Sequence, residues 1–203
     1  MEKKACIAMV PCPGQGHLIP LVEFAKRLLH QNNNNNLHVT FLIPTLGPPT
    51  PSVKSILNSL PPNMDFNILP HVNIEDLPQN THPATQMTLT VTRSLPFLHQ
   101  ALGSLHHNTH LVALVFDIFS IDALDFAKEF NLLSYVFYAS GALTLSFMLS
   151  FPKLDESVSS EFIEPTKIVN VPGSVMPFQA KDLVDLILYE RSGETYRSFL
   201  SVS

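Results

Sequence analysis

The chain begins with a strand, a loop rich in glycine and proline, a helix and a second strand, and this order restricts the fold more than any other feature. Residues 5–10 are an apolar run with β-branched members, and the sequence PCPGQG that follows breaks both strands and helices. Residues 17–30 repeat apolar side chains at spacings of three and four, which predicts a helix with one face on a sheet. Residues 37–43 stop at Pro44, as a second strand would. Together they predict a βαβ unit with parallel strands.

The rest of the chain continues this alternation. Continuous apolar residues at 111–116 predict a strand covered on both faces, which ends at Asp117. The other expected elements are helices at 53–60, 84–107 and 121–130, strands at 66–69, 135–138 and 168–171, and a helix from Ser192. Pro20 is expected in the first turn of its helix, and Pro96 is expected to bend or divide the helix at 84–107. The fold class is therefore α/β, a doubly wound, mostly parallel sheet with helices on both faces.

The composition fits a globular domain in a reducing compartment. Hydrophobic residues make up 45% and charged residues 14% of the 203 residues, a balance that disfavours disorder. The net charge of -5, with no basic cluster, disfavours nucleic acid and anionic lipid as partners. The two cysteines give no disulfide framework, so we expect a cytoplasmic protein.

One uncharged stretch approaches the length of a transmembrane helix. Residues 134–151 contain no charged side chain. Gly141 interrupts the stretch where a strand rich in aromatic residues would give way to a helix. We therefore expect a strand, a turn and a buried helix here, with no stable membrane insertion.

The first loop is the most informative segment for chemistry. Gly14 and Gly16 allow backbone N–H groups and a helix N-terminus to approach a negatively charged ligand. The loop does not fit a dinucleotide fingerprint, because Ile19 occupies the third glycine position and no acidic residue closes the second strand. This disfavours an NAD-dependent oxidoreductase. A serine hydrolase is disfavoured because the sequence has no Gly-x-Ser-x-Gly elbow.

His17 follows this loop, and Asp117 closes the strand at 111–116. Because the carboxyl ends of parallel strands lie at one edge of a sheet, the two side chains can meet there. An imidazole accepts a proton near neutral pH, and a carboxylate behind it selects one tautomer and stabilises the imidazolium. Taken singly, His17 can be a capping or surface residue and Asp117 a helix N-cap. As a pair, they predict a general base and the residue that orients it.

Four segments then resemble a known family. The sequence VPCPGQGHLIP at 10–20 is similar to the opening of plant family 1 UDP-glycosyltransferases. The sequences LTVTRS at 89–94, FDIF at 116–119 and FPKLDE at 151–156 resemble the branch that glucosylates phenols, hydroquinone and monolignol-type alcohols. The likeness runs along essentially the whole chain.

The resemblance implies a GT-B fold, in which two Rossmann-like domains face each other. It makes residues 1–203 the acceptor-binding domain, without the donor-binding domain and its tryptophan-containing signature. His17 would be the general base and Asp117 its partner in an inverting transfer of glucose from UDP-glucose to a small phenolic or alcohol acceptor. The resemblance implies no metal and no cofactor besides this co-substrate. The chain alone is expected to be inactive, because the donor is not held in line with the acceptor oxygen.

The resemblance also suggests binding residues. Gly14, Gln15, Gly16 and Ser140 would lie near the donor sugar and phosphates, and Phe119, Ile118, Met87 and Leu183 would contact the acceptor. Each of these four apolar residues is also an ordinary core residue, and Phe119 is the strongest candidate among them. Relatives commonly have serine at the position of Cys12.

Two other readings are weighed against this one. The histidines at 106, 107 and 110 do not have the spacing of a zinc site, so we expect a solvated helix end there. A truncated, non-catalytic domain that binds small phenolics or another chain is the alternative function. Such a domain would expose a large apolar face.

Overall fold

The computed structural model describes residues 4–32, 36–161, 163–183, 188, 191–193, 196, 197 and 200. The chain divides into two compact units, Met1–Ala139 and Ser140–Ser203. The first unit contains the parallel sheet and its covering helices, and the second contains one long helix and a short hairpin.

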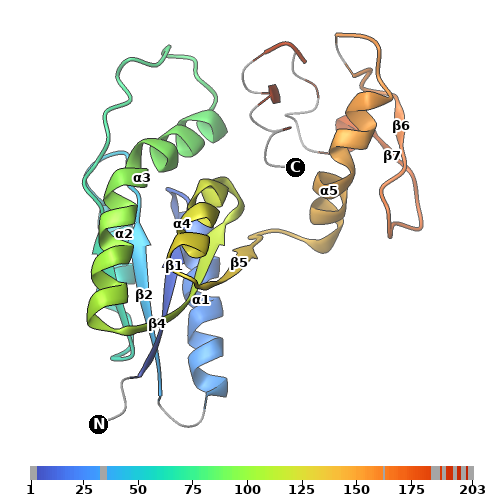
Figure 1. Cartoon of the computed structure of the whole chain (residues 1–203). Coiled ribbons are helices and arrows are strands. Elements are labelled where there is room, and N and C mark those ends of the chain that lie inside the picture. Colours follow the sequence, from blue (N-terminus) through green and yellow to red (C-terminus); the bar gives the residue numbers. More distant parts are fainter. Residues whose placement is uncertain are drawn as a thin grey trace. The chain divides into compact units, whose positions relative to one another are not determined.

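A five-stranded parallel sheet forms the centre of the first unit (Figure 1). Its strands are β1 (Ala5–Val10), β2 (Leu37–Ile43), β3 (Met64–Ile68), β4 (His110–Asp117) and β5 (Leu133–Phe137). They lie in the order β3-β2-β1-β4-β5, and every neighbouring pair is parallel. The strand order reverses at β1, because the chain leaves β3 at one edge and returns as β4 on the other side of β1. Open α/β sheets bind their ligands beside such a switch point.

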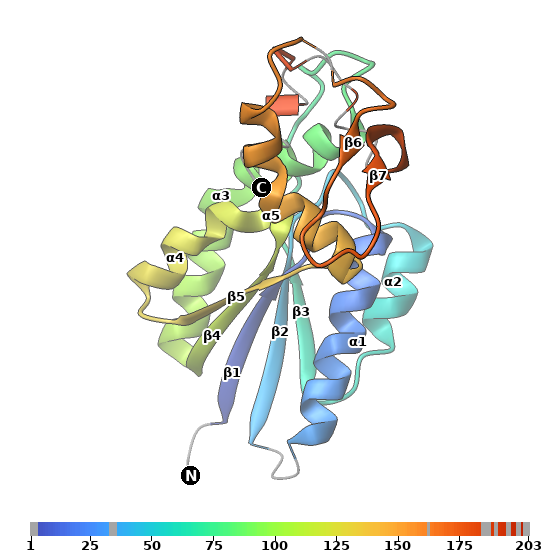
Figure 2. The ribbon, with the colours of Figure 1, turned by 90° about the vertical axis from the view of Figure 1, so that its right-hand side faces the viewer.

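The helices cover both faces of this sheet (Figure 2). They are α1 (Gln15–Gln31), α2 (Pro51–Asn58), α3 (Pro83–Asn108) and α4 (Leu124–Glu129), with a 3₁₀ turn η1 (Ile118–Ala123) before α4. The helices α1 and α2 lie on one face, and α3 and α4 lie on the other. This arrangement is the predicted doubly wound sheet.

Each face has its own hydrophobic core. On the α1 face, Met9 of β1 packs in one cluster with Leu21 of the helix, and both are fully buried. On the α3 face, Leu114 and Phe116 of β4 share a cluster with Leu98, which is also fully buried. Val115, which lies between Leu114 and Phe116, belongs to the cluster on the α1 face, so β4 is covered on both faces, as its continuous apolar sequence predicts.

Three predicted helices can be compared in detail with the structure. The helix α1 begins at Gln15, so Pro20 lies in its second turn and not in its first. The helix α3 continues through Pro96 and is bent along its length in Figure 1, which is one of the two outcomes expected there. The helix predicted at 121–130 begins in the 3₁₀ turn η1 and continues as α4, which ends at Glu129. The turn η1 is itself kinked at Ser120, which has φ -110° and ψ 23°.

The second unit contains α5 (Ala142–Glu156), the strands β6 (Ile168–Val169) and β7 (Phe178–Gln179), and a 3₁₀ turn η2 (Ala180–Asp182). The strand β6 pairs antiparallel with β7 and forms a separate sheet. The strand predicted at 168–171 is therefore shorter than expected and does not belong to the parallel sheet. The helix predicted from Ser192 falls largely on positions outside the described residues.

Aromatic rings and one arginine hold the second unit together. The ring of Phe151 lies 5.5 Å from that of Phe147 and 5.4 Å from that of Tyr196, and all three side chains are buried. Arg191 donates hydrogen bonds to the carboxylate of Asp155 and to the carbonyl oxygen of Val158, both at 2.7 Å. These contacts join the end of α5 to the segment that follows η2.

The uncharged stretch at 134–151 is divided between β5, a turn and the start of α5, as predicted. The helix is only partly buried, however: Phe147, Met148 and Phe151 are buried, whereas Leu149 is 70% exposed. Among the described residues, no helix has both the length and the hydropathy needed to cross a bilayer.

Candidate active site

Gly14 determines where α1 begins. It is the N-cap residue at φ 118° and ψ 151°, a backbone conformation that is essentially restricted to glycine. Its carbonyl oxygen accepts hydrogen bonds from the N–H groups of His17, at 3.3 Å, and Leu18, at 3.1 Å. The chain therefore turns sharply out of β1, and His17 lies in the first turn of α1.

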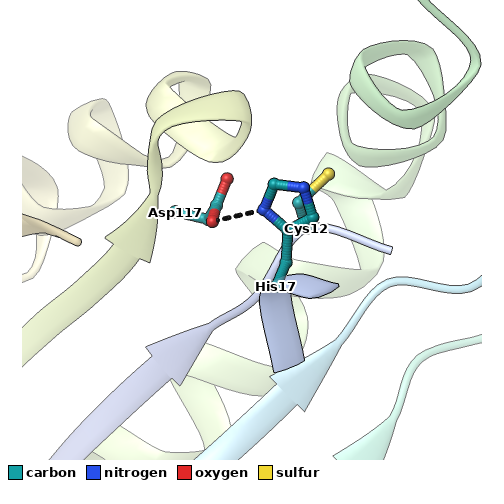
Figure 3. A group of neighbouring side chains, drawn as sticks. All are labelled: Cys12, His17 and Asp117. Carbon is teal, nitrogen blue, oxygen red and sulfur yellow. Dashed lines mark hydrogen bonds and ion pairs between the residues drawn. The ribbon is translucent and has the colours of Figure 1, made fainter. Parts of the chain in front are cut away.

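Asp117 meets His17 at the carboxyl edge of the sheet (Figure 3). The strands β1 and β4 are neighbours, with Val10 opposite Phe116, so the residues that follow them lie close together. The Nδ1 atom of His17 lies 2.8 Å from Oδ2 of Asp117. The other carboxylate oxygen accepts a hydrogen bond from the N–H of Phe119 at 3.1 Å, which makes Asp117 the N-cap of η1. Asp117 therefore makes both expected contacts at once, because it bonds to His17 and also caps η1.

This hydrogen bond selects the tautomer of His17. A carboxylate only accepts hydrogen bonds, so Nδ1 carries the proton and Nε2 keeps its lone pair. The Asp117 side chain is 1% exposed, whereas that of His17 is 22% exposed. A buried anion therefore holds one nitrogen of a ring that reaches solvent. Such an imidazole can accept a proton on the other nitrogen.

Two of the predicted acceptor residues lie beside this pair. The ring of Phe119 contacts that of His17 edge to face, with 5.6 Å between centroids and an interplanar angle of 78°. Met87 of α3 reaches the first loop, because its Cε atom is 3.7 Å from where a Cβ on Gly14 would lie. Ile118 is half-buried at the start of η1.

The remaining candidates divide between the two units. Gln15 and Gly16 are exposed in the first turn of α1, next to His17 in the chain. Ser140 and Leu183 belong to the second unit, where Ser140 is exposed and Leu183 is half-buried. The functional roles of these four residues, like those of the other candidates, remain predictions.

Two residues near the site carry no functional assignment from the sequence. The Cys12 thiol is 1% exposed, and its burial, followed by the charge of Asp117, raises its pKa well above the usual range. Burial and then the same charge also raise the pKa of Tyr138. Tyr138 directly follows β5, whose Phe137 lies opposite Asp117. It is also the last residue of the strand predicted at 135–138, and this strand end was the signal that could have identified it.

A pocket with a volume of about 260 Å³ opens beside the first loop. It is lined by residues 11–15, by the proline-rich loop at 44–50, and by Leu18, Val53 and Ile68. The lining is largely apolar, and Cys12 belongs both to it and to the surroundings of His17 and Asp117. An apolar ligand group can therefore lie within a short distance of the imidazole.

Solved plant glucosyltransferases have the same fold. An indoxyl-glucosylating UDP-glucosyltransferase from Polygonum tinctorium is 42% identical, with a TM-score of 0.89 over 98% of this chain and 43% of that chain. Phytolacca americana UGT2, solved with UDP-2-fluoro-glucose and pterostilbene, is 37% identical, with a TM-score of 0.90 over 98% of this chain and 45% of that one. The chain therefore has the fold of the N-terminal Rossmann-like half of a GT-B glycosyltransferase.

Sequence relatives give the family. Hydroquinone glucosyltransferase from Rauvolfia serpentina is 44% identical over 98% of this chain, and UDP-glycosyltransferase 72B3 from Arabidopsis thaliana is 47% identical over 96%. Over nearly its whole length the chain is similar to the N-terminal half of plant UDP-glycosyltransferases, and it resembles the branch that contains these two enzymes. It spans 42% and 40% of their respective lengths. No protein-family model matches the chain.

Proposed function

We propose that this protein supplies the acceptor site and the general base of an inverting UDP-glucose-dependent glucosyltransferase. Residues 1–203 would form its acceptor-binding domain. The observation that supports this most directly is the 2.8 Å hydrogen bond between His17 and Asp117, which leaves Nε2 of the imidazole free to accept a proton. The similarity to hydroquinone glucosyltransferase indicates small phenols as the acceptor class.

The proposed reaction is a single displacement. The acceptor hydroxyl donates a hydrogen bond to Nε2 of His17, and its proton moves to that nitrogen as the oxygen attacks the anomeric carbon of glucose. The bond between that carbon and the UDP oxygen breaks, and UDP leaves with the electron pair. Asp117 stabilises the imidazolium that forms, because its carboxylate already faces Nδ1.

The surroundings of His17 fit a phenolic acceptor. A phenol with an ordinary pKa of about 10 loses its proton to an imidazole more readily than an alkyl alcohol does. The apolar side chains of Phe119 and Met87 can contact an aromatic ring held near the base. Ile118, at the start of η1, would contribute to the same acceptor wall, and Leu183 stays a predicted acceptor contact.

The donor would be held mainly by a second domain. Related structures contain UDP or a UDP-sugar, and the chain spans less than half of each of them. Gly14, Gln15, Gly16 and Ser140 would lie near the sugar and phosphates, with backbone N–H groups at the start of α1 facing negative charge. The chain alone would bind an acceptor without glucosylating it.

The test uses a chimeric enzyme, in which this chain is joined to the donor-binding domain of a related plant glucosyltransferase. His17→Ala should lower the rate of hydroquinone glucosylation about 10²- to 10⁴-fold, the usual contribution of a general base. The Kd for UDP-glucose, measured by calorimetry, should stay unchanged. His30→Ala is the matched control, because His30 is exposed at the opposite end of the same helix. Equal losses of rate and donor binding in His17→Ala would contradict the proposal.

A further inference from the structure

Three different metal-binding side chains converge at the head of α1. The Sγ atom of Cys12, a ring nitrogen of His17 and a carboxylate oxygen of Asp117 all lie within 4.8 Å of one another (Figure 3). They come from the loop after β1, the first turn of α1 and the end of β4. Cys12 and Asp117 are each 1% exposed, so packing holds the sulfur and the carboxylate in place.

This set of donors suits a thiophilic divalent cation. Thiolate, imidazole and carboxylate are the ligands that Zn²⁺ uses in proteins, and open zinc sites have three protein ligands and one exchangeable position. Metal–ligand distances of about 2.0 to 2.3 Å place tetrahedral ligand atoms about 3.5 Å apart. The hydrogen-bonded nitrogen and oxygen atoms are 2.8 Å apart and all three ligand atoms lie within 4.8 Å, so metal binding would open the pair by about 0.7 Å and bring the sulfur closer by at most about 1.3 Å. A thiolate and a carboxylate also balance the two charges of the ion.

Two of the three ligands border a pocket or solvent. Cys12 lines the pocket of about 260 Å³, which opens beside the first loop. The His17 side chain is 22% exposed and closes the cluster on its solvent side. The cluster therefore combines two buried ligands with one that reaches solvent.

We propose that Cys12, His17 and Asp117 form a binding site for a thiophilic divalent cation such as Zn²⁺ or Cd²⁺. The cation forms bonds to the sulfur, one ring nitrogen and one carboxylate oxygen, and the thiol proton is released to solvent. Water or an acceptor oxygen occupies the fourth position.

The consequence for catalysis rests on the proposed function. A cation on Nε2 takes the lone pair that the base needs, and a cation on Nδ1 moves the ring proton to Nε2 with the same effect. Bound metal is therefore an inhibitor of transfer and not a cofactor. The thiol makes the general base sensitive to thiophilic ions.

The binding test uses the 203-residue chain itself, without donor or acceptor. Titration with Co²⁺ should give a thiolate-to-cobalt charge-transfer band in the near ultraviolet, and Zn²⁺ should displace the cobalt. Cys12→Ser should abolish the band. Cys6→Ser is the matched control and should keep the charge-transfer band. Cys6 is the other buried cysteine, but it lies at the opposite end of β1 from the cluster, where its sulfur contacts Thr40 of β2.

A second variant keeps the test decisive if Cys12→Ser does not fold. His17→Ala alters a partly exposed side chain and should weaken Zn²⁺ binding at least about tenfold, measured by competition with cobalt. Absence of the band in the unmodified chain, its persistence in Cys12→Ser or its loss in Cys6→Ser would overturn the proposal. Because no sugar transfer is measured, failure here leaves the role of His17 as a base intact, and failure of that role leaves the metal site intact.

Discussion

The imidazole of His17 and the carboxylate of Asp117 lie in hydrogen-bond contact, although 100 residues separate them in the chain. The contact exists because β1 and β4 are adjacent parallel strands whose carboxyl ends meet at one edge. Asp117 has two acceptor oxygens, and the second binds the N–H of Phe119. The carboxylate thus orients the histidine and starts η1 at once, so the position of the candidate base depends on the main fold.

Replacing Asp117 should impair the candidate base without removing it. In Asp117→Asn the anion is lost, and an amide N–H facing Nδ1 favours the tautomer that is protonated on Nε2. We expect kcat for hydroquinone in the chimeric enzyme to fall about 10²- to 10⁴-fold, with KM for UDP-glucose little changed. Asp122→Asn is the control. Asp122 is exposed in η1, and its carboxylate accepts a hydrogen bond from the hydroxyl of Thr92. An unchanged kcat in Asp117→Asn would argue against the base assignment.

Phe119 should affect acceptor binding more than the chemical step. Its ring contacts His17 edge to face, in a position where it can also contact an aromatic acceptor. In Phe119→Ala we expect KM for hydroquinone to rise about two- to tenfold, the effect of losing an aromatic contact of about 0.5 to 1.5 kcal/mol. Steady-state kinetics with each substrate varied in turn would measure it. The control is Phe97→Ala, which removes a ring that is 37% exposed on α3, and a matching rise there would refute a specific role.

Gly14→Ala should destabilise the first unit through the backbone. A Cβ at this position would meet only the Cε of Met87, at an ordinary 3.7 Å, so the cost comes from forcing alanine to φ 118°. Such strain costs about 1 to 3 kcal/mol, which urea denaturation followed by circular dichroism can measure. Gly16→Ala is the matched control. Gly16 lies inside α1 outside the left-handed region, with no atom within 4 Å of an added Cβ, so this change should be neutral or stabilising by up to about 1 kcal/mol. Equal destabilisation by both changes would refute this explanation.

Acid should weaken the second unit through Asp155. The Arg191 guanidinium, which donates from Nε at 2.7 Å, and the Tyr196 hydroxyl, which donates at 2.8 Å, hold the pKa of this carboxyl below its ordinary value. A carboxyl whose pKa is lower in the folded state stabilises the fold above its unfolded pKa of about 3.9, and this contribution is lost as the pH falls through the folded value.

Thermal unfolding at pH 7 and at successively lower pH, followed by near-ultraviolet circular dichroism of the aromatic cluster, tests this pH dependence. Asp155→Asn should lower Tm at pH 7 and flatten the decline of Tm below about pH 4. Asp125→Asn is the control, because its pair with Lys128 is largely exposed and contributes little. A decline of Tm in Asp155→Asn as steep as in the unmodified chain would show that other groups control acid sensitivity.

The central part of the fold was predictable because its signals are local. The strands β1 and β2 have the predicted bounds, and the apolar run before Asp117 correctly indicated a strand buried on both faces. Such patterns depend on the spacing of neighbouring side chains and on residues that stop an element. Where a local signal was weak, at residues 168–171, the predicted strand was too long and its hairpin partner was missed.

The sequence alone determined that a histidine follows a glycine turn out of one strand and that an aspartate closes another, since turn chemistry and apolar periodicity are written in consecutive residues. Only the tertiary structure decided which side chains surround them. The pairing of β1 with β4 shifts register between Cys6 and Ile7, and this irregularity helps to bring Val10 opposite Phe116. The closeness of Cys12, His17 and Asp117 depends on that register and on packing between segments far apart in the chain, which no local pattern encodes.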